Sequence, residues 1–124
     1  FQSLSRKHVL SIPPHATVRE AACAMTRAHC GSVLVMEPPD RLLGILTERD
    51  LMTRVLARSV DPETTAAREV MTPNPLCVKP EMRVSDAVVT MLERGFRHLP
   101  VIDEGKRILG VFSIRDAVPR ELST

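Results

Sequence analysis

Two short stretches of the sequence carry the same polar residue types at the same spacing. Thr47 and Asp50 lie three residues apart, and Ser113 and Asp116 repeat this arrangement 66 residues later. At the start of a helix, such a hydroxyl and carboxylate bond to free backbone N–H groups and form a capping box. The same two groups can instead bind a ligand, because a carboxylate accepts hydrogen bonds from both hydroxyls of a vicinal diol. The residue types alone leave both interpretations open.

A glycine precedes each pair, and an arginine stands inside it. Gly44 and Gly110 lie three residues before the hydroxyl, where a capping box does not need a glycine. A glycine at that position lets a ligand approach the backbone closely. Arg49 and Arg115 directly precede the aspartates, so they can reach a phosphate, or pair on the surface with an acid such as Glu48.

The two stretches belong to a longer internal repeat. Residues 14–50 align with residues 80–116 without a gap. The identical positions are Pro14/Pro80, Val18/Val84, Ala21/Ala87, Met25/Met91, Val35/Val101, Arg41/Arg107, Leu43/Leu109, Gly44/Gly110, Arg49/Arg115 and Asp50/Asp116. Each copy reads β-α-β-β-α and is too small to bury both faces of its sheet. We therefore expect an α/β (α+β) fold in which two repeats pack with their sheets facing.

The apolar periodicity and the turn residues predict the elements of each copy. In the first copy we expect an extended segment at 9–12, a helix from Thr17 with a Glu20 capping box to Gly31, strands at 32–36 and 42–46, and a helix from Glu48. In the second we expect an extended segment at 76–78, a helix with the core stripe Val84, Ala87, Val88, Met91 and Leu92 that ends at Gly95, strands at 98–102 and 108–112, and a helix from 114 to about 121. The expected organisation is a tag remnant and lead-in (1–7), first repeat (8–58), linker (59–73) and second repeat (74–124).

Composition excludes several classes of function. The net charge of +2 and the 2% aromatic content argue against a nucleic-acid binder. The apolar runs are far shorter than the ~20 residues of a membrane span. Cys23, Cys30 and Cys77 are odd in number and lack Cys-x-x-Cys spacing, which argues against disulfides or a metal site and for a reduced, cytoplasmic protein.

The chain resembles a tandem pair of CBS (cystathionine β-synthase) domains, a Bateman module. The resemblance rests on Gly44–Asp50 and Gly110–Asp116, on Val70-Met-Thr-Pro-Asn-Pro-Leu76, and on Phe96-Arg-His-Leu-Pro-Val-Ile-Asp103. It implies two repeats about a pseudo-twofold axis, no catalysis and no required cofactor. It also implies regulatory binding of an adenosine-containing nucleotide (AMP, ADP, ATP, NAD or S-adenosylmethionine) in clefts between the repeats, and commonly a homodimer.

The resemblance also assigns residues to two clefts. The first cleft would contain Ile45, Thr47, Asp50, Leu76, Cys77, Arg97 and His98, and the second would contain Leu10, Ser11, Gly31, Ser32, Val111, Ser113 and Asp116. Arg97 and His98 can hold phosphate by charge-assisted hydrogen bonds, whereas Gly31 and Ser32 bring no charge. We therefore expect the first cleft to prefer phosphorylated nucleotides. The alternative is a ligand-free dimerisation or protein-interaction module.

Overall fold

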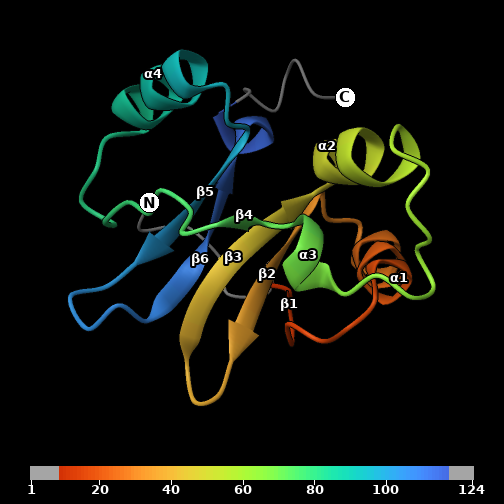
Figure 1. The fold of residues 1–124 in the computed structure, drawn as a ribbon. Helices are drawn as coiled ribbons and strands as arrows, with labels where there is room; N and C mark the ends of the chain where they lie inside the picture. Colours follow the sequence, from red (N-terminus) through yellow and green to blue (C-terminus); the bar gives the residue numbers. More distant parts are fainter. Residues whose placement is uncertain (1–8, 118–124) are drawn as a thin grey trace. The chain divides into compact units, whose positions relative to one another are not determined.

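The computed structural model describes residues 9–117. Leu10–Pro75 forms one compact unit, the first unit, and residues 76–117 belong to another, the second unit (Figure 1). The first unit contains β1 (Ser11–Ile12), α1 (Val18–Ala28), β2 (Ser32–Glu37), β3 (Arg41–Thr47), α2 (Glu48–Asp50), the π-helix η2 (Leu51–Leu56), α3 (Ala67–Val70) and β4 (Thr72–Pro73). The second unit contains α4 (Val84–Arg94), β5 (His98–Ile102), β6 (Ile108–Ser113) and the 3₁₀ helix η3 (Ile114–Ala117). The predicted α+β fold class is confirmed.

The first unit is a four-stranded sheet with helices against one face. Its strand order is β1-β2-β3-β4, with β1 parallel to β2 and the other pairs antiparallel. Val33, Val35 and Leu46 face a core formed with buried residues of α1, η2 and α3. Side chains alternate between the two faces of a strand, so Ile45 lies on the face opposite these helices.

The second unit repeats this arrangement around the hairpin β5–β6. Val78 forms a parallel bridge to Val101, as Ile12 does to Val35 in the first unit. The register of both hairpins shifts immediately after the equivalent valines, Val35 and Val101. The core of the second unit consists of Val78, Ala87, Met91, Leu99, Val101 and Phe112. The internal repeat predicted from sequence is therefore also a repeat of strand register.

Helix α1 begins where the sequence predicts and ends earlier than expected. Thr17 caps it, since its Oγ1 accepts a hydrogen bond from the Glu20 N–H at 3.1 Å. The helix ends at Ala28, and His29 adopts the left-handed conformation with φ 54°. The prediction that Gly31 closes this helix was therefore wrong. The equivalent prediction for α4 is confirmed, because Gly95 has φ 74°.

Helix α4 buries fewer apolar residues than its sequence stripe predicts. Ala87 and Met91 are buried, whereas Val84 is 43% and Leu92 is 73% exposed. Leu92 follows Met91 and so points about 100° away from it around the helix. Val18, the counterpart of Val84, donates its N–H to the Thr65 carbonyl of a loop in its own unit. The core stripe was thus wrong at both ends.

Two predictions extend beyond the described residues. The expected final helix is described only as the 3₁₀ turn Ile114–Ala117, and its remainder to residue 121 lies outside them, as does the lead-in 1–7. Across residues 9–117, every helix is too short or too polar to cross a lipid bilayer.

Candidate functional site

The Thr47–Asp50 pair forms a complete capping box at the junction of β3 and α2. The Thr47 N–H donates to Asp50 Oδ2 at 2.9 Å, and the Asp50 N–H donates to Thr47 Oγ1 at 3.2 Å. Asp50, the third residue of α2, is only 9% exposed. The capping interpretation therefore describes how both side chains are held. A carboxylate has about four acceptor positions, so this bond leaves capacity for a ligand.

The second pair has a looser version of the same geometry. The Ser113 N–H donates to Asp116 Oδ2 at 2.8 Å, and the Ser113 hydroxyl lies 3.4 Å from the same oxygen. Asp116 is exposed, whereas its counterpart Asp50 is buried. The two copies thus differ in the accessibility of the carboxylate, which the sequence did not indicate.

Within each unit, the neighbouring strand brings further candidate residues beside the box. In the first unit Ser32 pairs with Thr47, and the Gly31 carbonyl accepts from the Glu48 N–H at 3.0 Å. Ser32 is 7% exposed. The polar end of the β2–β3 hairpin therefore carries Gly31, Ser32, Thr47 and Asp50 together.

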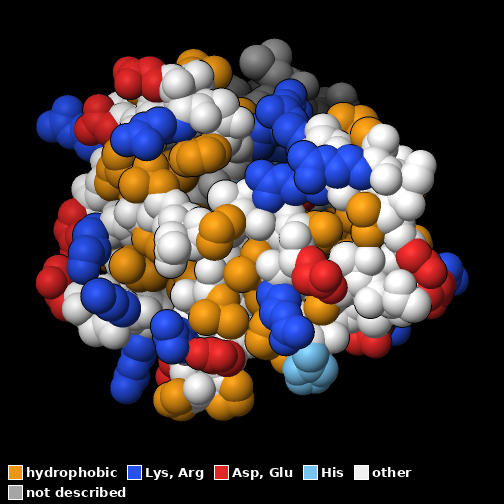
Figure 2. Space-filling model, in the orientation of Figure 1, with side chains coloured by type: hydrophobic (Ala, Val, Ile, Leu, Met, Phe, Trp, Pro, Cys, Tyr) orange, Lys and Arg blue, Asp and Glu red, His pale blue; other side chains and the backbone are white. Residues whose placement is uncertain are grey.

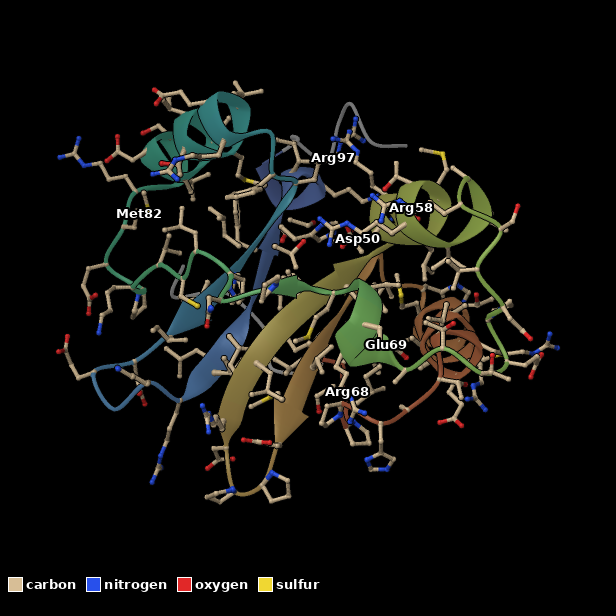
Figure 3. All side chains as sticks on the ribbon, viewed as in Figure 1. Asp50, Arg58, Arg68, Glu69, Met82 and Arg97 are labelled. Carbon is tan, nitrogen blue, oxygen red and sulfur yellow. The ribbon has the colours of Figure 1, made fainter. Side chains whose placement is uncertain are left out.

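The second unit gathers the equivalent residues at the same end of its own hairpin. His98 pairs with Ser113, and the Arg97 carbonyl accepts from the Ile114 N–H at 3.0 Å. Arg97 is exposed, and Figure 3 labels it beside the start of β5. Two predicted pairings each combine residues of both units, and they stay predictions. One pairs Arg97 and His98 with Thr47 and Asp50, and the other pairs Gly31 and Ser32 with Ser113 and Asp116.

The apolar candidates occupy equivalent positions in the two units. Leu10 and Leu76 each pack partly buried against the core of their own unit. Ile45 and Val111 lie on the sheet faces opposite the helices. Ser11 follows Leu10 and is exposed, whereas Cys77 follows Leu76 and is half-buried. Burial raises the pKa of the Cys77 thiol.

Gly44 has a structural role that the sequence interpretation missed. A Cβ at this position would lie 2.5 Å from Met71 Sδ and 2.7 Å from the Thr72 carbonyl oxygen. Thr72 pairs with Ile45 in the β3–β4 ladder, so the glycine is needed for the close packing of this segment. At Gly44, close packing against Met71 and Thr72 therefore explains the glycine, in place of the expected space for a ligand.

Arg54 is the residue near Asp50 that sequence reasoning missed. Its Nε lies 3.8 Å from Asp50 Oδ1, and its Nη1 donates to the carbonyls of Val70 and Met71 at 3.0 Å each. The spacing of four residues from Asp50 was the available signal. Arg49 and Arg115, which were considered instead, are exposed.

The cysteines and acids of the described chain do not assemble a metal centre. The Cys30 thiol donates to the Ala28 carbonyl at 3.4 Å. Among residues 9–117, no three His, Cys, Asp or Glu side chains come together in a way that would hold a metal ion.

Comparison with known proteins places this geometry in one family. The CBS domain model matches residues 2–57 and 67–120. An uncharacterised protein of Methanopyrus kandleri is 31% identical over 95% of this chain. The chain spans 60% of the length of that relative.

Two solved structures resemble the fold over most of its length. A putative signal-transduction protein with CBS domains from Burkholderia ambifaria has a TM-score of 0.86 and 29% identity, with 94% of this chain and 85% of that chain covered. A CBS domain protein from Pyrobaculum aerophilum, complexed with AMP, has a TM-score of 0.82 and 27% identity, with 94% and 88% covered.

Proposed function

The chain belongs to the CBS domain family, and we propose that it is a non-catalytic regulatory module that binds an adenosine-containing nucleotide. AMP, ADP, ATP, NAD and S-adenosylmethionine are the candidate ligands. Binding shifts the population of conformations of the module, and no bond is made or broken.

The observation that carries this proposal is the pair of hydroxyl–carboxylate boxes at equivalent strand ends. Each box holds its carboxylate through a backbone N–H, at 2.9 Å for Asp50 and 2.8 Å for Asp116, so the side chain is oriented before a ligand arrives. A carboxylate held in this way can accept hydrogen bonds from both hydroxyls of a ribose. The AMP complex of the similar Pyrobaculum protein supports adenosine as the ligand class.

We assign the ribose of the preferred ligand to Thr47 and Asp50, with Arg97 and His98 on its phosphate and Ile45, Leu76 and Cys77 beside its base. Arginine suits the phosphate because its planar fork donates two parallel hydrogen bonds. Ser113 and Asp116, with Leu10, Ser11, Gly31, Ser32 and Val111, form the second, less charged site.

A panel of the five candidate ligands tests this proposal by thermal shift and titration calorimetry. A ligand that binds only the folded state stabilises it by about 2.7 kcal/mol at a hundredfold excess over its Kd. We expect AMP to raise the melting temperature, Asp50→Asn to remove most of that effect, and Asp116→Asn to change it little. The matched control is Asp86→Asn, which alters an exposed aspartate on α4. No shift with any nucleotide at millimolar concentration favours the ligand-free interaction module instead.

We also propose that the module forms homodimers. Val84, Val89 and Leu92 of α4 are 43%, 51% and 73% exposed, and hydrophobic side chains reach the surface among charged ones in the α4 region (Figure 2). Light scattering should give a dimer mass for the wild type and a monomer mass for Leu92→Glu, with Glu93→Gln as control. We further propose a reducing, cytoplasmic location, because the sequence has an odd number of cysteines and no Cys-x-x-Cys spacing.

A further inference from the structure

Arg54 connects two parts of the first unit that lie far apart in the sequence. It belongs to η2, where the Ala57 N–H donates to the Met52 carbonyl five residues earlier. Its guanidinium reaches the carbonyls of Val70 and Met71, each 3.0 Å from Nη1. Its side chain is 35% exposed, so these bonds are partly shielded from water.

These carbonyls stand at the end of the short helix α3. The last carbonyls of a helix lack partners within it, and a four-residue helix has little stability of its own. Nη1 of the planar guanidinium donates to both of these successive carbonyls and so fixes this helix end. Arg54 therefore holds the start of the chain segment that continues into β4.

The other side of the same guanidinium faces the candidate site. Nε lies 3.8 Å from Asp50 Oδ1, which is an ion-pair distance and too long for a hydrogen bond. The second oxygen, Oδ2, accepts from Thr47, and the Asp50 side chain is 13% exposed. The charge of Asp50 thus helps to keep Arg54 in place.

The segment that Arg54 holds lies directly against strand β3. Met71 Sδ would be 2.5 Å from a Cβ at Gly44, Thr72 pairs with Ile45, and the Asn74 N–H donates to the Leu43 carbonyl at 3.1 Å. This segment, residues 70–74, immediately precedes Pro75, the last residue of the first unit.

We propose that Arg54 is a positioning residue that couples the state of Asp50 to the order of residues 70–74. When the carboxylate is fixed, the guanidinium is fixed, and both carbonyl bonds to α3 persist for longer. In this way a ligand on Asp50 tightens the segment that leads into the second repeat. The ligand-dependent part rests on the proposed function, whereas the coupling itself belongs to the free protein.

Amide hydrogen exchange in the ligand-free chain measures this coupling. The reporters are the amides of Met71, which donates to Ala67 at 3.0 Å, and of Asn74. Arg54→Gln should speed the exchange of both amides about threefold or more, as should Asp50→Asn. Because Asp50 acts through Arg54, Asp50→Asn should add little in the Arg54→Gln background. Equal effects of Asp50→Asn in both backgrounds would overturn the coupling.

Two controls separate coupling from general destabilisation. Arg58→Gln alters an exposed arginine just beyond η2, labelled in Figure 3, and should leave both reporter amides unchanged. The Leu34 amide, which donates to Leu10 at 2.8 Å, should exchange at the wild-type rate in every variant. If Arg54→Gln does not fold, Arg54→Lys replaces it, because it keeps the charge and loses the planar fork.

Addition of AMP then separates this inference from the proposed function. In the wild type, AMP should slow exchange at Met71 and Asn74, and in Arg54→Gln it should bind without slowing them. AMP binding to the wild type with no change at these amides would overturn the regulatory role of Arg54. Absence of binding by all five candidate ligands would contradict the proposed function, and the ligand-free double-mutant cycle would still decide the coupling.

Discussion

Met71 lies so close to the backbone of Gly44 that a Cβ on the glycine would come within 2.5 Å of its Sδ. The Thr72 carbonyl oxygen, 2.7 Å from the same point, belongs to the backbone and cannot move aside as easily as the methionine tip. Any side chain at residue 44 therefore pushes β4 away from β3.

We predict that Gly44→Ala destabilises the chain by about 1–3 kcal/mol, which is typical of overpacking. The matched control is Gly105→Ala, where the nearest atom, Asp103 Oδ1, lies 3.5 Å from the added Cβ. Urea unfolding should show a lower midpoint for Gly44→Ala alone. Identical midpoints for the two variants would contradict the packing account.

The hydroxyls of the two boxes should contribute unequally to stability. Thr47 Oγ1 accepts from the Asp50 N–H at 3.2 Å, whereas the Ser113 hydroxyl makes only a long 3.4 Å contact with a carboxylate that is exposed. We expect Thr47→Ala to cost about 1 kcal/mol, which is typical of a lost N-cap, and Ser113→Ala to cost clearly less. Chemical denaturation of both variants measures the difference, and a larger cost for Ser113→Ala would be inconsistent with it.

The arginine at residue 97 should distinguish nucleotides from nucleosides. If it binds phosphate, Arg97→Gln weakens AMP binding about tenfold or more, because charge-assisted hydrogen bonds contribute roughly 1.5–3 kcal/mol. Adenosine binding should change little, and Arg94→Gln, another exposed arginine, is the control. Calorimetry with both ligands makes the comparison.

The same variant also tests which box shares its ligand with Arg97. The prediction pairs it with Thr47 and Asp50, while within its own unit Arg97 lies at the strand end of Ser113 and Asp116. Combined with Asp116→Asn, Arg97→Gln should still reduce AMP binding. Combined with Asp50→Asn, it should have no further effect. The opposite result would assign Arg97 to the second box.

The Cys77 thiol should react more slowly than an exposed cysteine. Burial raises its pKa, so at pH 8 a smaller fraction is thiolate, the reactive form. For the same reason the folded state holds this proton more tightly, so the stability is full below the pKa of the unfolded thiol and declines as pH rises from there through the raised pKa of the folded thiol. Mass spectrometry after timed iodoacetamide treatment should show Cys23 modified first. Faster modification of Cys77 would contradict the raised pKa.

The sequence predicts the repeated elements well because their signals are local. Prolines, glycines and alternating apolar residues place β2, β3, β5 and β6 within a residue or two, and the capping spacing identifies Thr47 and Asp50, whereas the two-residue strand β4 was not predicted. Helix ends are harder, since His29 rather than a nearby glycine takes the left-handed conformation. Neither the exposure of Leu92 nor the burial of Asp50 follows from residue type, because both depend on which segments pack above them.

Arg54 illustrates why the candidate site was only partly predictable. Its spacing from Asp50 is visible in the sequence, but its hydrogen bonds reach residues 70 and 71. Such bonds depend on the path of the loop between η2 and α3, which no periodicity specifies. Sequence reasoning could therefore identify the box and could not identify what supports it.

The two hairpins also suggest the order in which the chain folds. Strands β2 and β3 pair across residues 38–40, and β5 and β6 pair across residues 103–107, so both hairpins lose little chain entropy when they close. Strand β4 is different, because Thr72 must find Ile45 across the whole of η2 and α3. We expect this strand to join last and to detach first, so that the earliest opening of the native state exposes the edge of β3.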